Sequence, residues 1–307
     1  MISRKHHPFK ALAALLLVPL ILTGCAATAQ EDQQPSVVVT TNILADVVQN
    51  LVGDQAQVHT LMPANVDPHS FEISAQQAAL LNDADLVVSN GLNLEEGLQN
   101  QLEAVDAAGK DHFVATDHVQ VLNVSGSSGA ADPHFWTDPV QMISVVDALA
   151  TDLQELPGIQ PEQLNEDTQS YRGELTALEQ QMSDSFNQIP EESRALVTNH
   201  HVFGYLSKRF GFRTVGAVIP SGTTLASPSA ADLASLAEAI RTSKVSAIFV
   251  ESAQPDKLAR ALADEANIDV QIVHLYSESL TLPGEPAYSY LKMMQVNTEK
   301  ITQALRN

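Results

Sequence analysis

The sequence is poor in cysteine, in aromatic residues and in basic residues. Its 307 residues include one Cys, 5% aromatic residues, and 16 Lys and Arg against 37 Asp and Glu, which gives a formal net charge of -21. A single cysteine excludes a disulfide within the chain and a Cys-rich zinc or iron–sulfur site. So few basic residues argue against binding of nucleic acid and against electrostatic adhesion to anionic lipid. Any metal site therefore has to be built from histidines and carboxylates.

Two common enzyme signatures are also missing. The sequence contains no HExxH pattern, which would supply two zinc ligands and a general base to a metallohydrolase. It contains no GxSxG pattern of the kind that presents a nucleophilic serine. We therefore expect that the protein is not an enzyme, and a metal-dependent hydrolase is the competing class.

The N-terminus has the features of a signal peptide. Arg4, Lys5 and Lys10 make a basic start, and Ala11 to Leu22 is an apolar run. The run is too short to span a bilayer comfortably, so a signal peptide over residues 1–24 is the better interpretation than a transmembrane helix.

The only cysteine, Cys25, follows this segment directly. Residues 22–25 (LTGC) resemble the bacterial lipobox, in which cleavage leaves the cysteine at the new N-terminus and lipid is attached to it. The alternative is a secreted protein with a cysteine at this place by chance. The resemblance implies lipidation of Cys25, a flexible tether over residues 25–35, and an extracytoplasmic protein anchored to the membrane, in the periplasm or at the cell surface.

Beyond residue 35, short β-branched runs alternate with amphipathic stretches. We expect strands at residues 37–41, 58–61, 86–89, 113–115, 195–198, 214–218, 247–250 and 270–275. We expect helices at residues 43–52, 75–81 and 94–108. This alternation predicts an α/β fold with two lobes, each containing a mainly parallel sheet flanked by helices. We place the N-terminal lobe at residues 36–156 and the C-terminal lobe at residues 191–307.

The segment between the lobes has a helical pattern throughout. Apolar residues recur at helical spacing over residues 161–187, Pro161 is suited to the first turn, and Pro190 marks the end. We predict one long rigid helix that joins the lobes, within a linking segment at residues 157–190. The alternative is an ordinary surface helix inside one large domain.

The tripeptide Asp-Pro-His occurs twice, ending at His69 in DPHSFE and at His134 in DPHFWTDP. Proline restricts the backbone before each histidine. A helix start follows each one: Ser74 precedes the helix expected at residue 75, and Asp138 precedes Pro139. Each histidine is therefore expected on a restrained loop, which suits a metal ligand.

Three further candidates follow strands of the second half. His200 and His201 come directly after the strand at residues 195–198, and Glu278 comes after the strand at residues 270–275. Residues at the carboxyl ends of parallel strands converge in space, so a set of three imidazoles and one carboxylate is predicted, which suits Zn²⁺. We expect His200 and His201 to open a short helix that ends at Gly211. Adjacent residues at a helix start point about 100° apart, and the pattern alone does not choose between His200 and His201.

Other polar residues receive supporting roles or none. Glu251 ends the strand at residues 247–250, and we expect it to orient a liganding histidine or its loop. We place His201 with Glu251 as a second residue that supports the site without binding the metal. The remaining histidines of the two lobes have no matching motif, and we expect no ligand role for His59, His112, His118 and His274.

Together these segments resemble the metal-binding solute-binding lipoproteins of bacterial ABC transporters, the periplasmic zinc-binding protein family. The resemblance rests on DPHSFE, DPHFWTDP, NHHVFGYLSKRFG, the FVES strand end and the terminal run that begins LPGEPAYSYLKMM. It implies two α/β lobes joined by a rigid helix, with the metal held between them. The family's histidines fall on His69 and His134, and its third ligand falls on His200 and not on His201. Its last ligand is usually Asp, where this sequence has Glu278.

The resemblance also implies a function. It predicts a receptor that captures a divalent metal and delivers it to an ABC permease and its ATPase in the cytoplasmic membrane. Three imidazoles favour Zn²⁺ as the transported ion, while the absence of a His-rich loop favours Mn²⁺, and Fe²⁺ is a further alternative. We expect a monomer, and the fold leaves open a second role as an adhesin.

Overall fold

The structure is a computed structural model that describes residues 1–2, 34–125, 129–243, 245–266 and 270–306. Residues 3–24 of the predicted signal peptide, Cys25 and most of the predicted tether lie outside these residues. Residues from Gln34 onward form one unit. Within the described residues, no helix has both the length and the apolar character needed to cross a membrane.

The first half contains a four-stranded parallel sheet. Its strands are β1 (Ser36–Val39), β2 (Gln57–Thr60), β3 (Leu86–Ser89) and β4 (His112–Val114), in the order β2-β1-β3-β4. The central strands β1 and β3 are apolar and buried on both faces, as expected where helices cover a parallel sheet. The connecting helices are α1 (Asn42–Val52), α2 (Ala75–Asp83) and α3 (Gln99–Ala107).

The second half repeats this plan. Its parallel sheet consists of β7 (Ala195–Thr198), β8 (Arg213–Ala217), β9 (Ala247–Glu251) and β10 (Gln271–Leu275), in the order β10-β9-β7-β8. Its helices are α6 (Gly204–Phe210), α7 (Ala230–Ser243), α8 (Lys257–Ala266) and α9 (Tyr290–Leu305). The predicted α/β class with two parallel sheets is confirmed. A small antiparallel pair, β5 (Leu122–Asn123) with β6 (Ala131–Asp132), precedes the second Asp-Pro-His segment.

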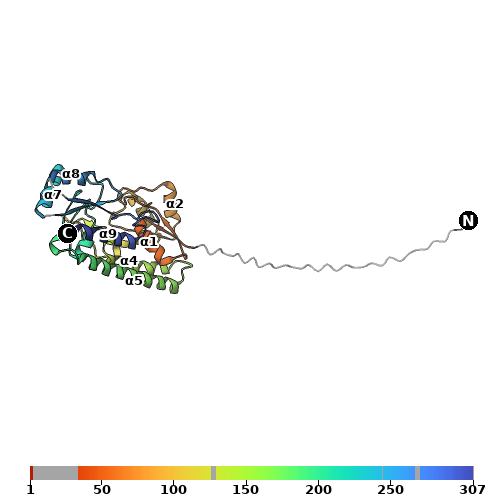
Figure 1. Ribbon diagram of the computed structural model, residues 1–307. Helices are drawn as coiled ribbons and strands as arrows, with labels where there is room; N and C mark the ends of the chain where they lie inside the picture. The colour runs from red at the N-terminus through yellow and green to blue at the C-terminus, as the bar shows by residue number, and fades with distance from the viewer. Residues whose placement is uncertain (3–33, 126–128, 244, 267–269, 307) are drawn as a thin grey trace. The chain divides into compact units, whose positions relative to one another are not determined.

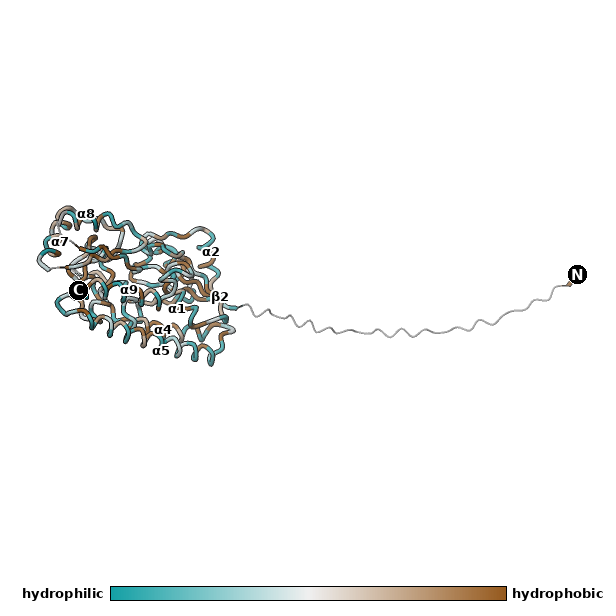
Figure 2. Tube along the Cα trace, in the orientation of Figure 1, coloured by the Kyte–Doolittle hydropathy of each residue, from teal (hydrophilic) through white to brown (hydrophobic). Residues whose placement is uncertain are grey.

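Two helices connect the sheets. Helix α4 (Pro139–Gln154) is followed by α5 (Pro161–Phe186), which has 26 residues and runs along one edge of the unit next to α4 (Figure 1). Helix α5 packs on α1, α4 and α9 through the apolar positions that the sequence pattern marks. These residues belong to one hydrophobic core that includes side chains of both sheets. Apolar positions gather in the central strands, and polar positions lie on outer turns (Figure 2).

Each Asp-Pro-His segment is followed by a helix, and both of these helices have the N-terminal caps that the sequence predicts. Ser74 and Gln77 form a reciprocal capping box at α2. The Asp138 carboxylate accepts a 2.9 Å hydrogen bond from the Val140 amide at α4, where Pro139 occupies the first turn. Both loops are therefore anchored by the helices that follow them.

Two local predictions were wrong. The helix expected over residues 94–108 is split into a 3-10 turn, η1 (Glu96–Leu98), and α3. Within the 3-10 turn, Gly97 packs so closely on the Phe71 carbonyl that no side chain would fit. His200 and His201 do not open a helix, since α6 begins only at Gly204. The His200 carbonyl instead accepts hydrogen bonds from the Thr198 hydroxyl at 2.6 Å and the Val202 amide at 3.0 Å, which hold a tight turn.

Candidate metal centre

Four side chains that the sequence predicts as ligands meet in the structure. His69 and His134 come from the first half of the chain, and His200 and Glu278 come from the second. All four are buried, with exposed fractions of 0–2%. One potential ligand atom from each lies within 4.8 Å of the others. The structure therefore brings together the whole predicted set, from positions up to 209 residues apart.

The spacing of these atoms suits a small ion. Oε1 of Glu278 lies 3.1 Å from Nε2 of His69, 3.1 Å from Nε2 of His200 and 3.4 Å from Nε2 of His134. Nε2 of His134 lies 3.4 Å from Nε2 of His69. Ligand atoms about 2.0–2.1 Å from a tetrahedral ion are separated from each other by about 3.4 Å. Four of the six distances between these atoms are therefore close to those of a tetrahedral site, and all four atoms lie within 4.8 Å of one another.

The Asp-Pro-His segments hold their histidines through the aspartate. Oδ1 of Asp67 accepts a 2.9 Å hydrogen bond from the His69 amide, and Oδ1 of Asp132 accepts a 3.0 Å hydrogen bond from the His134 amide. Asp132 also lies 2.7 Å from Nδ1 of His134, so it orients the ring as well as the backbone. Sequence reasoning assigned no role to either aspartate, although the repeated tripeptide contained the signal.

The loop that carries Glu278 is held from two sides. Glu251 accepts hydrogen bonds from the amide of Ser277 at 2.8 Å, from the hydroxyl of Ser277 and from the amide of Ala253 at 3.1 Å. The indole Nε1 of Trp136 donates to the Ser277 carbonyl at 2.8 Å. Glu251 therefore contacts the loop of Glu278 and not a histidine. Burial raises its pKa.

The cluster has an uneven charge distribution. Burial raises the pKa of Glu278, but the surrounding imidazoles outweigh this effect and lower it well below its usual range. Burial lowers the pKa of His134, but hydrogen bonds to Asp132 and Glu278 outweigh this effect and raise it to about 9. Burial lowers the pKa of His200. At neutral pH the metal-free cluster therefore contains a carboxylate and a protonated His134.

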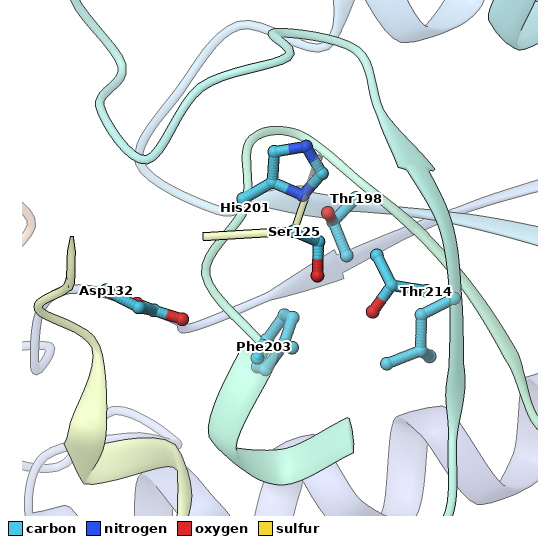
Figure 3. Close-up of a pocket in the computed structure, with 8 residues that line it drawn as sticks. Ser125, Asp132, Thr198, His201, Phe203 and Thr214 are labelled. Atoms are coloured by element: carbon cyan, nitrogen blue, oxygen red, sulfur yellow. The ribbon is translucent and has the colours of Figure 1, made fainter. Parts of the chain in front are cut away.

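His201 lies outside the four-residue cluster. Its ring lines a small pocket of about 10 Å³ together with Ser125, Thr198 and Phe203, as Figure 3 shows. Its amide donates to the Ser221 carbonyl at 2.9 Å. The structure thus places His200 in the cluster and His201 outside it, a choice that the sequence pattern alone did not make.

The histidines for which we expected no ligand role also lie outside the cluster. His112 contacts Ser89 at 2.8 Å and Asp106 at 2.7 Å, and His118 stacks on Phe113. His274 contacts Asp256. His59 is on the edge strand β2.

Comparison with known proteins identifies the family. Residues 37–304 match the family described as zinc-uptake complex component A, periplasmic. The chain belongs to this family. The resemblance found in the sequence motifs is confirmed, and so is the fold class that it implied.

Relatives of known name are substrate-binding proteins of metal transporters. The manganese ABC transporter substrate-binding lipoprotein PsaA of Streptococcus mitis is 30% identical, over 96% of this chain and 97% of its own. The metal ABC transporter substrate-binding lipoprotein SsaB of Streptococcus sanguinis has the same identity and coverage. The periplasmic zinc binding protein TroA of Treponema pallidum superposes with a TM-score of 0.81 and 29% identity, over 89% of this chain and all of its own.

Solved structures of this fold include different ions. A manganese-bound periplasmic metal binding protein from Candidatus Liberibacter asiaticus has a TM-score of 0.79 and 25% identity, over 88% of this chain and 99% of its own. The names of these relatives thus mention manganese, zinc or only a metal. They agree that the proteins bind or transport a metal.

Proposed function

We propose that this protein is the extracytoplasmic receptor of an ABC transporter that takes up a divalent transition metal, with zinc as the first candidate. His69, His134, His200 and Glu278 bind the ion, and a permease with its ATPase in the cytoplasmic membrane receives it. The observation that carries the proposal is that three imidazole nitrogens and one carboxylate oxygen, all buried, lie within 4.8 Å of one another. Family membership supports the role in transport.

The burial of the cluster supports capture rather than catalysis. A metallohydrolase keeps one coordination position open to water and substrate. Here the four side chains have exposed fractions of 0–2%, which leaves no exposed face of the cluster where an organic substrate could lie. The relatives are substrate-binding components of transporters, which supports a role without a bond-making step.

Manganese is the second candidate, and one atom favours it. Oε2 of Glu278 is buried and has no hydrogen-bond partner among the described residues. If this oxygen joins Oε1 on the ion, the coordination number rises to five, which Mn²⁺ accepts more readily than a four-ligand site. The name of the Streptococcus mitis relative, PsaA, includes the same ion. Fe²⁺ is a third alternative with similar ligand preferences.

The remaining parts of the proposal concern the location of the protein. Lipid on Cys25 would hold the receptor at the membrane, and the names of the relatives as lipoproteins support this. A Cys25→Ser variant is expected to leave the membrane fraction. A monomeric state and an adhesin role stay predictions from sequence.

Metal titration of the purified mature protein tests the binding site. Zn²⁺ and Mn²⁺ affinities are measured by calorimetry and chelator competition for the wild type, His69→Ala, His134→Ala and the control His59→Ala. We expect both site variants to lose at least tenfold in affinity and the control to match the wild type. Equal affinity in all four proteins would contradict the assignment of His69 and His134 as metal ligands. Hydrolysis of an ester, peptide or phosphate substrate that disappears in the same site variants would favour the hydrolase.

A further inference from the structure

The two Asp-Pro-His segments hold their histidine rings differently. Nδ1 of His134 contacts Asp132 at 2.7 Å. Nδ1 of His69 has no hydrogen-bond partner in the described part of the chain, although the residue is only 1% exposed. A buried ring N–H without an acceptor is costly, so this atom needs a partner when Nε2 binds a metal.

Asp67 does not supply that partner because its second oxygen is already engaged. Oδ2 of Asp67 accepts hydrogen bonds from the hydroxyl of Thr224 at 2.6 Å and from Nε2 of Gln254 at 3.0 Å. Both partners belong to the second half of the chain. The carboxylate that orients the ring in one segment therefore connects the two halves in the other.

Glu96 is the carboxylate nearest to the unpartnered atom in the residues that the structure describes. Its Oε1 lies 3.7 Å from Nδ1 of His69. The same oxygen accepts a 2.5 Å hydrogen bond from the hydroxyl of Thr223, across 127 residues of sequence. The Glu96 side chain is 29% exposed, so it has room to move the remaining distance.

Metal binding would strengthen this contact. An imidazole that gives its Nε2 lone pair to a cation becomes a better donor at Nδ1–H, and a carboxylate on that proton fixes the tautomer and the ring orientation. Asp132 already meets this condition for His134. Glu96 meets it for His69 after a shift of about 1 Å, the difference between 3.7 Å and an ordinary N–H···O distance.

We propose that Glu96 is the positioning residue of His69, and that Thr223 ties this contact to the second half of the chain. This inference rests on the proposed function. The two histidines are then oriented by different carboxylates: Asp132 of its own segment orients His134, whereas Glu96, which accepts from Thr223, orients His69. Separation of the halves would break the contacts that Thr223 and Thr224 make with Glu96 and Asp67.

Variants of Glu96 and Thr223 test the inference. Zn²⁺ affinity is measured by chelator competition for Glu96→Ala, Glu96→Gln, Thr223→Val and the double variant Glu96→Ala/Thr223→Val. Glu103→Ala is the control, because it removes the same charge from an exposed position of α3. We expect Glu96→Ala to weaken binding about 10–100-fold, and Glu96→Gln, which keeps an acceptor oxygen, less than tenfold. Thr223→Val is expected to weaken binding alone and to have no added effect beside Glu96→Ala.

A spectroscopic measurement separates positioning from a general structural effect. In the zinc-loaded protein with ¹⁵N-labelled histidine, the Nδ1–H proton of His69 is expected in NMR spectra of the wild type and of Glu96→Gln. It is expected to be lost in Glu96→Ala, where the signal of His134 persists. Equal zinc affinity in Glu96→Ala and Glu103→Ala, or an unchanged His69 signal in Glu96→Ala, would overturn the inference. Unchanged affinity in His69→Ala would overturn the proposed function itself, and this inference with it.

Discussion

Oδ1 of Asp132 lies 2.7 Å from Nδ1 of His134, and the two residues are separated in sequence only by Pro133. Both side chains are almost fully buried. The contact orients the ring and, with Glu278, raises its pKa to about 9 despite burial. A metal ion requires the neutral ring, so binding has to displace a proton that is present at neutral pH.

Metal binding is therefore expected to release this proton. Because the pKa of His134 in the folded protein is raised from 6.5 to about 9, Zn²⁺ affinity should increase by about tenfold per pH unit between these values and level off above pH 9. Calorimetry in buffers with different ionisation enthalpies counts the released protons. In Asp132→Asn the plateau should begin at lower pH and the affinity should fall about 10–100-fold. A wild-type plateau that begins near pH 6.5 would contradict this assignment.

The contact of Asp132 also depends on a glycine in the other half. A Cβ at Gly204 would overlap Oδ2 of Asp132. Gly204→Ala is expected to displace Asp132, to reduce zinc affinity by tenfold or more and to lower the free energy of unfolding by about 1–3 kcal/mol. Gly173→Ala is the control: this glycine lies inside α5 with no atom near its Cβ position. The control should gain about 0.5–1 kcal/mol in urea unfolding and keep its affinity. Wild-type metal affinity in Gly204→Ala would show that Asp132 is free to move.

Replacement of Glu278 distinguishes the two candidate ions. Glu278→Gln removes the charge and leaves a neutral oxygen and an amide at the position that now lies 3.1 Å from two imidazoles. Mn²⁺ depends more on carboxylate oxygen than Zn²⁺ does, so its affinity should fall further, while zinc affinity should fall at least tenfold. Chelator competition with both ions measures the ratio, with Glu285→Gln as a control for charge in an exposed part of the same loop. Equal losses for the two ions would contradict the stronger dependence of Mn²⁺ on this carboxylate, and no loss for either ion would argue against a direct bond from Glu278.

Asp46 is expected to limit stability at neutral pH. Burial raises its pKa from 3.8 to about 6, although its hydrogen bond from the Tyr290 amide partly opposes this. A carboxyl whose folded pKa is raised binds more protons in the folded state, so stability falls as pH rises through 6. Asp46→Asn keeps an acceptor for Tyr290 and should gain up to about 3 kcal/mol at pH 7.5.

The gain in Asp46→Asn should shrink as pH falls from about 6 toward 3.8, because below 3.8 the carboxyl becomes protonated in the unfolded state as well. Urea unfolding of the metal-free protein at several pH values measures it. Asp54→Asn removes the same charge from an exposed position and serves as the control. A pH-independent gain would rule out the titration of Asp46 as the cause.

Much of the fold follows from local patterns. The strand β3 and the helix α5 begin and end within one residue of the expected positions, because apolar periodicity, prolines and caps act over short distances. The apolar pattern of residues 94–108 did not predict the 3-10 turn at residues 96–98, where Gly97 lies so close to the Phe71 carbonyl that a side chain would not fit. That contact joins two separate segments, and the periodicity of one segment alone does not predict it.

Residue types at short spacing were enough to predict the family, the class of fold and four candidate ligands. The neighbours of these candidates followed only from the three-dimensional structure. It separated His200 from His201 through a turn held by Thr198, and it placed Glu96 between His69 and Thr223. Such contacts join segments that are far apart in the chain. They depend on how two sheets pack through a shared core, which local sequence patterns do not specify.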